Sequence, residues 1–301
     1  MAPVLRQIAN LWTLIEHPSK ETEWSLNEKL DAICGAGFDG VCWAPSPELH
    51  RGALERGLIF IGGMASDDAT AFPRVLCELQ QYGAHQVNVQ LAGDEVLTPE
   101  ALKLTVQLIR EAERLGLKPA IETHRGTCTE TPEKLYALAN AYEQETGKLL
   151  PISWDFSHFA VVKHLAPENF AERLLVRPDL IQNAQQFHFR PFNGHHAQVP
   201  ITDGAGRLTQ EVLDWMPFAE AVLNCWLAAN LETDRKMFIC PELGPLVGGY
   251  ALSTFPNGWE DTLRLRQEID HLWSRVIASA STSERFHRAD GTALENGPSS
   301  A

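Results

Sequence analysis

Lys118-Pro-Ala-Ile-Glu-Thr-His-Arg-Gly126 reads as a short buried strand whose last inward residues are a carboxylate, Glu122, and an imidazole, His124. Three later stretches have the same form, an apolar run that ends in a residue able to bind a metal ion, and they cover residues 151–158, 185–190 and 236–244. Their strand ends add Asp155, His188 and Glu242. Functional side chains at the carboxyl ends of parallel strands meet at one face. These four ends therefore offer a candidate ligand shell for one divalent cation: Glu122, Asp155, His188 and Glu242.

Short apolar segments and helical patterns alternate along the rest of the chain, as in parallel βαβ units. The strands expected before the quoted stretch cover residues 8–14, 39–44, 58–63 and 85–91. Helix starts are indicated by a capping box, Ser25 with Glu28, and by an N-cap threonine before proline at Thr98 and at Thr131. Two further helical patterns cover residues 209–231 and 261–277.

Eight such units without a linker predict an α/β fold, a single (β/α)8 TIM barrel over residues 1–278. An open doubly wound sheet is the alternative, but no glycine-rich phosphate loop follows the first strand. Residues 279–301 are rich in Ser, Thr, Gly and Asn and contain few apolar residues, so we expect a disordered tail there.

The composition argues against several classes of function. The net charge of the 301 residues is −14, whereas nucleic-acid binding is driven by Lys and Arg, so no nucleic-acid partner is expected. The sequence has no apolar run of about 18 residues that would span a membrane, and its start lacks the pattern of a signal peptide. Six cysteines without CxxC spacing fit a reduced, cytoplasmic protein better than a disulfide framework.

The electrostatics of the four strand-end residues favour a bound ion. Taken singly, a strand-end Glu or His is a capping or ion-pair residue as often as it is a metal ligand. Three carboxylates at one barrel mouth, however, would repel each other by about 3–4 kcal/mol per pair at an effective dielectric near 20. Only Arg125 and Arg190 lie close in sequence, so a divalent cation is the simpler way to balance the charge. Carboxylates favour Mg²⁺ or Mn²⁺ and the imidazole shifts the preference towards Mn²⁺ or Co²⁺, which makes Mn²⁺ the expected ion.

The same stretches resemble the motifs of a known superfamily. Ile121-Glu-Thr-His, Trp154-Asp-Phe-Ser-His158, Phe187-His-Phe-Arg190 and Pro241-Glu-Leu are similar in order and spacing to those of the xylose isomerase-like TIM barrels. That superfamily includes sugar isomerases, ketose 3-epimerases, inosose dehydratase-like lyases and the apurinic endonuclease IV group. The resemblance, over residues 5–278, implies that Glu122 and Glu242 bind the metal and act as the acid/base pair. It also implies that Asp155 and His188 complete the ligand set and that His158 contacts a substrate hydroxyl.

Strand seven departs from the superfamily pattern. The sequence His188-Phe-Arg-Pro191 lacks the acidic residue that many members have there, and Gly194 stands where the epimerases have an arginine. Arg190 could substitute as a substrate contact. The endonuclease branch needs further histidines on strands two and three, and residues 43–45 and 62–64 contain none, so a three-metal phosphodiesterase site is not expected.

The function expected from these features is a metal-dependent isomerase or epimerase of a sugar-like ketone or polyol. Glu122 or Glu242 would remove a proton next to the carbonyl to give a metal-stabilised enediolate, with substrate contacts from His124, His158 and Arg190. Two alternatives stay open: a metal-dependent lyase or dehydratase that eliminates a β-substituent, and a non-catalytic binding barrel stabilised by metal. The expected partner is a small sugar-like molecule, and a homo-oligomer is possible. Trp12 and Trp43 are candidates for the barrel mouth or plain core residues, and Asn88 and Gln90 line the mouth unless Val87 and Val89 point inwards there. The pair His195-His196 is expected in a solvated loop rather than over the substrate.

Overall fold

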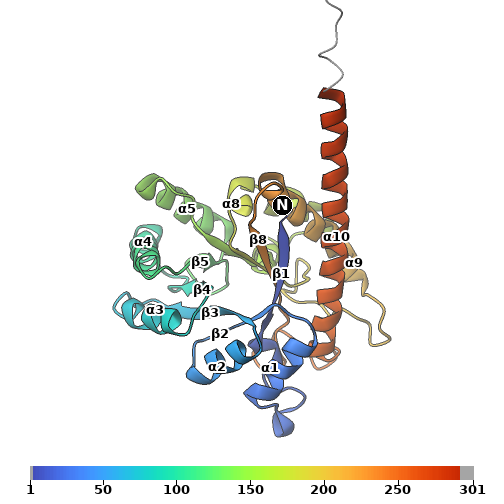
Figure 1. The fold of residues 1–301 in the computed structure, drawn as a ribbon, viewed down its shortest axis with the longest axis horizontal. Helices are drawn as coiled ribbons and strands as arrows, with labels where there is room; N and C mark the ends of the chain where they lie inside the picture. The colour runs from blue at the N-terminus through green and yellow to red at the C-terminus, as the bar shows by residue number, and fades with distance from the viewer. Residues whose placement is uncertain (1–2, 292–301) are drawn as a thin grey trace, which may run out of the picture.

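The structure, a computed structural model, describes residues 3–291. Within them, eight parallel strands close into a barrel in which each strand pairs with the next in sequence and β8 pairs with β1 (Figure 1). The strands are β1 (Val4–Asn10), β2 (Gly40–Trp43), β3 (Ile59–Ser66), β4 (Gln86–Leu91), β5 (Pro119–Glu122), β6 (Ile152–Trp154), β7 (Gln186–Phe189) and β8 (Lys236–Pro241). The predicted (β/α)8 TIM barrel is confirmed.

Helices surround the strands (Figure 1). They are α1 (Leu26–Gly35), α2 (Pro47–Glu55), α3 (Phe72–Gln81), α4 (Thr98–Arg114), α5 (Pro132–Thr146), α6 (Phe156–Val162), α7 (Phe170–Leu174), α8 (Pro178–Gln182), α9 (Gln210–Asn230) and α10 (Gly258–Gly291). The predicted capping box is present, because Ser25 and Glu28 hydrogen-bond reciprocally at the start of α1. Thr131 caps α5 as predicted. The prediction for Thr98 was wrong: the N-cap of α4 is Leu97, and Thr98 is already helical, which places Pro99 inside the first turn.

The first strand lies earlier than the sequence predicted. β1 ends at Asn10, and Leu11–Leu14 form a 3-10 helix instead of the second half of a strand over residues 8–14. The cause is the side chain of Asn10, which accepts a hydrogen bond from the backbone N–H of Trp12 and so caps the helical turn. Asn10 consequently stands at the carboxyl end of its strand.

The apolar core has two parts. The larger one fills the space between sheet and helices and includes Val87 and Val89 of β4. A small separate cluster, Ile8, Cys42, Ile61 and Phe238, comes from four neighbouring strands and lies inside the barrel. Because side chains alternate along a strand, residues two positions further on from this inner layer point to the barrel mouth. Asn10, two residues after Ile8, therefore points to the carboxyl end of the barrel, above this apolar cluster.

The closing helix α10 runs to Gly291, and therefore continues into residues 279–301, where the sequence predicts a disordered tail. No proline occurs between residues 278 and 291 to stop a helix. Residues 292–301 of the predicted tail lie outside the described residues. Among the described residues, no helix combines the length and the apolar character that a membrane span requires.

Candidate active site

The carboxyl ends of β5, β6, β7 and β8 place the predicted residues at one mouth of the barrel. Glu122 is the last residue of β5, Asp155 follows β6, His188 lies in β7, and Glu242 follows β8. Hydrogen bonds fix these strand ends. The Thr129 hydroxyl donates to the carbonyl oxygen of Glu122 at 2.6 Å. The Thr123 side chain accepts from the backbone N–H of Asp155 at 2.6 Å and donates to its carbonyl oxygen at 2.9 Å.

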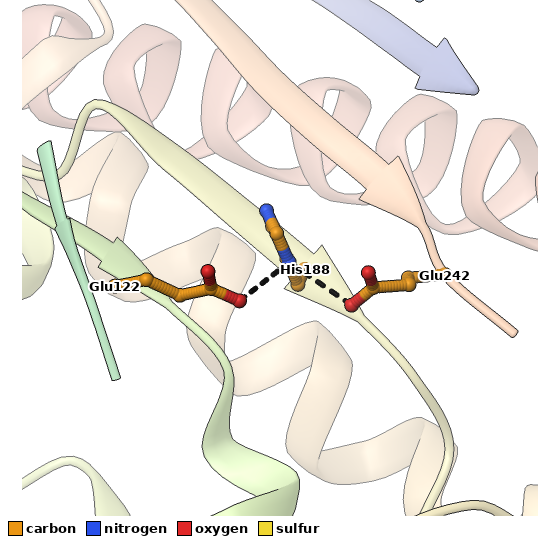
Figure 2. Close-up of side chains that lie close together, drawn as sticks. All are labelled: Glu122, His188 and Glu242. Carbon is orange, nitrogen blue, oxygen red and sulfur yellow. Dashed lines mark hydrogen bonds and ion pairs between the residues drawn. The ribbon is translucent and has the colours of Figure 1, made fainter. Parts of the chain in front are cut away.

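Glu122 and Glu242 lie on two sides of His188 (Figure 2). The Nδ1 atom of His188 is 3.3 Å from Oε1 of Glu122 and 3.0 Å from Oε2 of Glu242. One ligand atom from each of the three residues lies within 4.8 Å of the others, and all three side chains are buried. One nitrogen and two carboxylate oxygens therefore converge on a common point.

Amide side chains hold the outer atoms of this group. Asn88 donates to Oε2 of Glu122 at 2.8 Å, and Asn10 donates to Oε1 of Glu242 at 2.6 Å. The amide of Gln186 lies 3.0 Å from Nε2 of His188. Each carboxylate thus has one oxygen fixed by an asparagine and the other directed to the shared centre. Such outer partners orient metal ligands and set the tautomer of a ligand histidine. Asn88 was predicted at the mouth only as the alternative to Val87 and Val89, and Asn10 was not predicted.

Asp155 belongs to a neighbouring group. Its Oδ2 forms an ion pair with Nη2 of Arg190 and lies 3.3 Å from Nε2 of His158, and its Oδ1 accepts from the backbone N–H of Ser157 at 2.9 Å. The same Nη2 atom of Arg190 is 3.5 Å from Oε2 of Glu242, which links the two groups. The structure therefore brings three of the four predicted ligands together and places the fourth, Asp155, beside them in contact with two predicted substrate residues.

The buried charges set the protonation states. Burial raises the pKa of each carboxyl, but opposite charges outweigh it: His188 lowers the pKa of Glu122 to about 2, and His188 and Arg190 lower that of Glu242. The pKa of Asp155 is held well below its usual value, because Arg190 and His158 outweigh its burial. Burial alone would lower the pKa of His188, yet the two glutamates raise it well above its usual value. The two glutamates thus favour a proton on Nδ1 of His188, whereas burial lowers the pKa of His158 and favours its neutral ring.

The donor set fits a divalent cation. With the histidines neutral, three buried carboxylates face one guanidinium, which leaves two negative charges without a partner. One divalent ion compensates them, and it would take the place of the proton on Nδ1 of His188. Two carboxylates and an imidazole suit Mn²⁺, Co²⁺ or Mg²⁺.

A cavity of about 510 Å³ opens above this group. Among the predicted residues, Glu242, Arg190 and His124 line it, together with Trp12, Trp43, Asn88 and Gln90. Glu122, His188, Asp155 and His158 are at most 3% exposed and lie behind that lining. His195 lines a different cavity, next to His164 and Phe192, so the histidine loop after β7 does not contribute to this wall.

Tyr250 and Arg125 also line the cavity, and neither was predicted as a substrate contact. Tyr250 lies in the β8–α10 connection, where no periodic pattern signals its position. It contacts Trp12 edge-on, with 4.8 Å between ring centroids. Gly244 makes this approach possible, since a Cβ atom there would lie 2.4 Å from Cη2 of Trp12 and 2.7 Å from Cβ of Tyr250.

Comparison with known proteins places the fold. No protein-family model and no curated protein matches the sequence. A D-tagatose 3-epimerase-like protein superposes with a TM-score of 0.57 at 14% identity, over 90% of this chain and 99% of that one. A xylose isomerase-like TIM barrel protein from Mycobacterium smegmatis, in complex with magnesium, gives 0.55 at 13% identity, over 92% and 98%. The fold is that of the xylose isomerase-like TIM barrels.

A third neighbour has a different activity in its name. The probable 3-DHS dehydratase AsbF from Bacillus anthracis superposes with a TM-score of 0.52 at 12% identity, over 87% of this chain and 99% of that one. The predicted resemblance is confirmed at the level of the fold. Epimerases and a dehydratase share this barrel, so the fold alone does not determine the chemistry of this chain.

Proposed function

We propose that the protein is a divalent-metal-dependent isomerase or epimerase of a sugar-like ketone. The observation that carries the proposal is the placement of two carboxylates on opposite sides of His188, with Nδ1 within 3.3 Å of both. Isomerisation and epimerisation require one group to remove a proton next to a carbonyl and a group to return it. Two carboxylates that flank one centre provide both.

Glu122, His188 and Glu242 would hold the ion, with Asp155 beside them. When bound, a divalent cation at this position supplies Lewis-acid polarisation of a carbonyl oxygen. Asn10 and Asn88 keep the two glutamates in place by fixing the oxygen that faces away from the centre. The ligand residues are therefore oriented before any substrate enters.

The chain's own groups account for the proton transfer. Glu242 lines the cavity and is placed to exchange a proton with a bound ketone there. Glu122 faces the same centre from β5 and is the candidate for the opposite proton transfer. Positioned acid/base groups contribute about 10²–10⁴-fold each to the rate. Arg190, whose Nη2 lies 3.5 Å from Oε2 of Glu242, favours the ionised form of that carboxyl.

The cavity suits a molecule of sugar size. A volume of about 510 Å³ is within the range of small-molecule sites, and its wall combines polar groups with aromatic rings. His124 lies on the wall, while His158 stands behind it with its ring centroid 4.5 Å from that of His124. We assign His124 and Arg190 to direct contact with substrate hydroxyls and His158 to their support.

Incubation of the Mn²⁺-loaded protein with a panel of keto-sugars in D₂O, followed by NMR, tests the proposal. Exchange of the hydrogen next to the carbonyl, with formation of an isomer, is the expected result. Exchange with loss of a leaving group would identify the lyase that is the alternative on the same site. Stoichiometric metal without exchange on any ketone would leave a binding barrel and contradict the enzyme.

A further inference from the structure

Two arginines contact one tyrosine at the wall of the cavity. The guanidinium carbon of Arg125 lies 4.2 Å from the centre of the Tyr250 ring, and that of Arg190 lies 4.6 Å from it. The three residues come from different connections, after β5, β7 and β8, and all of them line the cavity. Cationic and hydroxyl groups thus gather at one side of the space above Glu242.

Several hydrogen-bond donors of this group have no partner within the described chain. They are the hydroxyl of Tyr250 and the Nε and Nη1 atoms of Arg190, all of which are buried. The Arg190 side chain is 1% exposed, so these N–H groups are withdrawn from bulk water. Buried polar atoms are nearly always hydrogen-bonded in native proteins. Because Arg190 and Tyr250 both line the cavity, a ligand bound there can supply the partners that these donors lack.

The charges of the wall differ in how they are balanced. Arg190 is paired with Asp155 and lies near Glu242. Arg125 is exposed, and its guanidinium contacts the Tyr250 ring. Once a divalent ion balances the buried carboxylates, Arg125 supplies one further positive charge at the cavity. A carboxylate carries one negative charge and a phosphate ester about −1.5 to −2 at neutral pH, so the carboxylate is the better match.

We propose that the substrate is a sugar-sized keto acid whose carboxylate is bound by Arg125 and the hydroxyl of Tyr250, next to the free N–H groups of Arg190. The inference rests on the proposed function for the keto group and adds the chemical class of the substrate. Arginine suits this role because its planar donors match a carboxylate and because it stays charged when stacked on a ring.

Three ligands that differ only at C6 test the inference: D-fructose, D-fructuronate and D-fructose 6-phosphate. Calorimetric titration of the Mn²⁺-loaded protein should give the tightest binding for D-fructuronate. Arg125→Gln should weaken D-fructuronate by about 10–100-fold and leave D-fructose unchanged, since only the charged hydrogen bonds are lost. Tyr250→Phe should weaken the same ligand less. Arg110→Gln, an exposed arginine of α4 away from the cavity, is the matched control and should change nothing.

Each of the following outcomes would overturn the inference of a carboxylate site. D-fructuronate that binds no better than D-fructose, or not at all at millimolar concentration, excludes a carboxylate site. A preference that persists in Arg125→Gln excludes this arginine, and a preference for the phosphate ester excludes the carboxylate class. The proposed function is tested separately. Exchange of the α-hydrogen of D-fructose without a preference for the carboxylate supports the proposed function and excludes the carboxylate site. Arg125-dependent binding of D-fructuronate without exchange on any ketone contradicts the proposed enzyme and supports the carboxylate site.

Discussion

Arg190 and Asp155 form an ion pair in which both side chains are 1% exposed. The sequence predicted different roles for these residues: Asp155 as a metal ligand and Arg190 as a substrate contact. In the structure the two side chains instead pair with each other. Nε2 of His158 lies 3.3 Å from Oδ2 of Asp155, and Oε2 of Glu242 lies 3.5 Å from Nη2 of Arg190. The protein therefore supplies one of the positive charges that its own buried carboxylates require.

Arg190→Gln should destabilise the metal-free protein by about 3–5 kcal/mol, because Asp155 would remain buried without its partner. Urea unfolding measures the loss. Arg177→Gln is the matched control: its partner Asp179 has a side chain 42% exposed, and removal of such a surface pair costs about 0–1 kcal/mol. Equal losses in the two variants would show that the buried pair has no special weight.

Asn10→Ala and Asn88→Ala should each weaken Mn²⁺ binding by about 10–100-fold, since each removes a hydrogen bond that orients a ligand glutamate. Titration with Mn²⁺ gives the affinity. Asn230→Ala removes a buried asparagine that bonds to Gln182 and Trp226, far from the site in the fold, and should lower stability without changing the affinity. Unchanged affinity in the first two variants would contradict the orienting role.

Mn²⁺ binding should release about one proton per ion near pH 7, because the ion and the proton compete for Nδ1 of His188. The pKa of His188 is raised in the absence of the ion, so the ring is protonated at neutral pH and affinity should rise with pH until the pKa is passed. Calorimetry in buffers of different ionisation enthalpy counts the proton. Binding that does not depend on pH or buffer would exclude His188 as a ligand.

Glu122→Gln and Glu242→Gln should each abolish exchange of the α-hydrogen with solvent, with a loss of at least about 10²-fold. Metal content has to be measured in the same samples, because loss of the ion would give the same result. Glu145→Gln, an exposed glutamate of α5, is the control that should keep full activity. A variant that exchanges at a near-normal rate would exclude its residue as the acid or base.

The main outline of the site could be predicted because it depends on the backbone. Strand ends that alternate with helices fix a barrel, and a barrel fixes the face at which Glu122, His188 and Glu242 meet. The position of each of these side chains follows from the period of two along its strand. No knowledge of loops or rotamers is needed for that step.

The remainder depends on features that have no periodic signal. Asn10 lies at the site because β1 ends at this residue, whose side chain caps the helical turn that follows, whereas the sequence predicted a strand that continued to residue 14. Tyr250 belongs to a long connection, and its packing on Trp12 depends on the space left by Gly244. The pairing of Asp155 with Arg190 is a choice among side-chain contacts within one buried group, and strand order does not decide it.

A crystal of the protein soaked with Mn²⁺ and measured at the manganese edge tests the central claim most directly. We predict a single anomalous peak per chain, bound by Nδ1 of His188 and by one carboxylate oxygen each of Glu122 and Glu242. A crystal without such a peak, or with manganese bound elsewhere and His188 still between the two glutamates, would contradict the metal site.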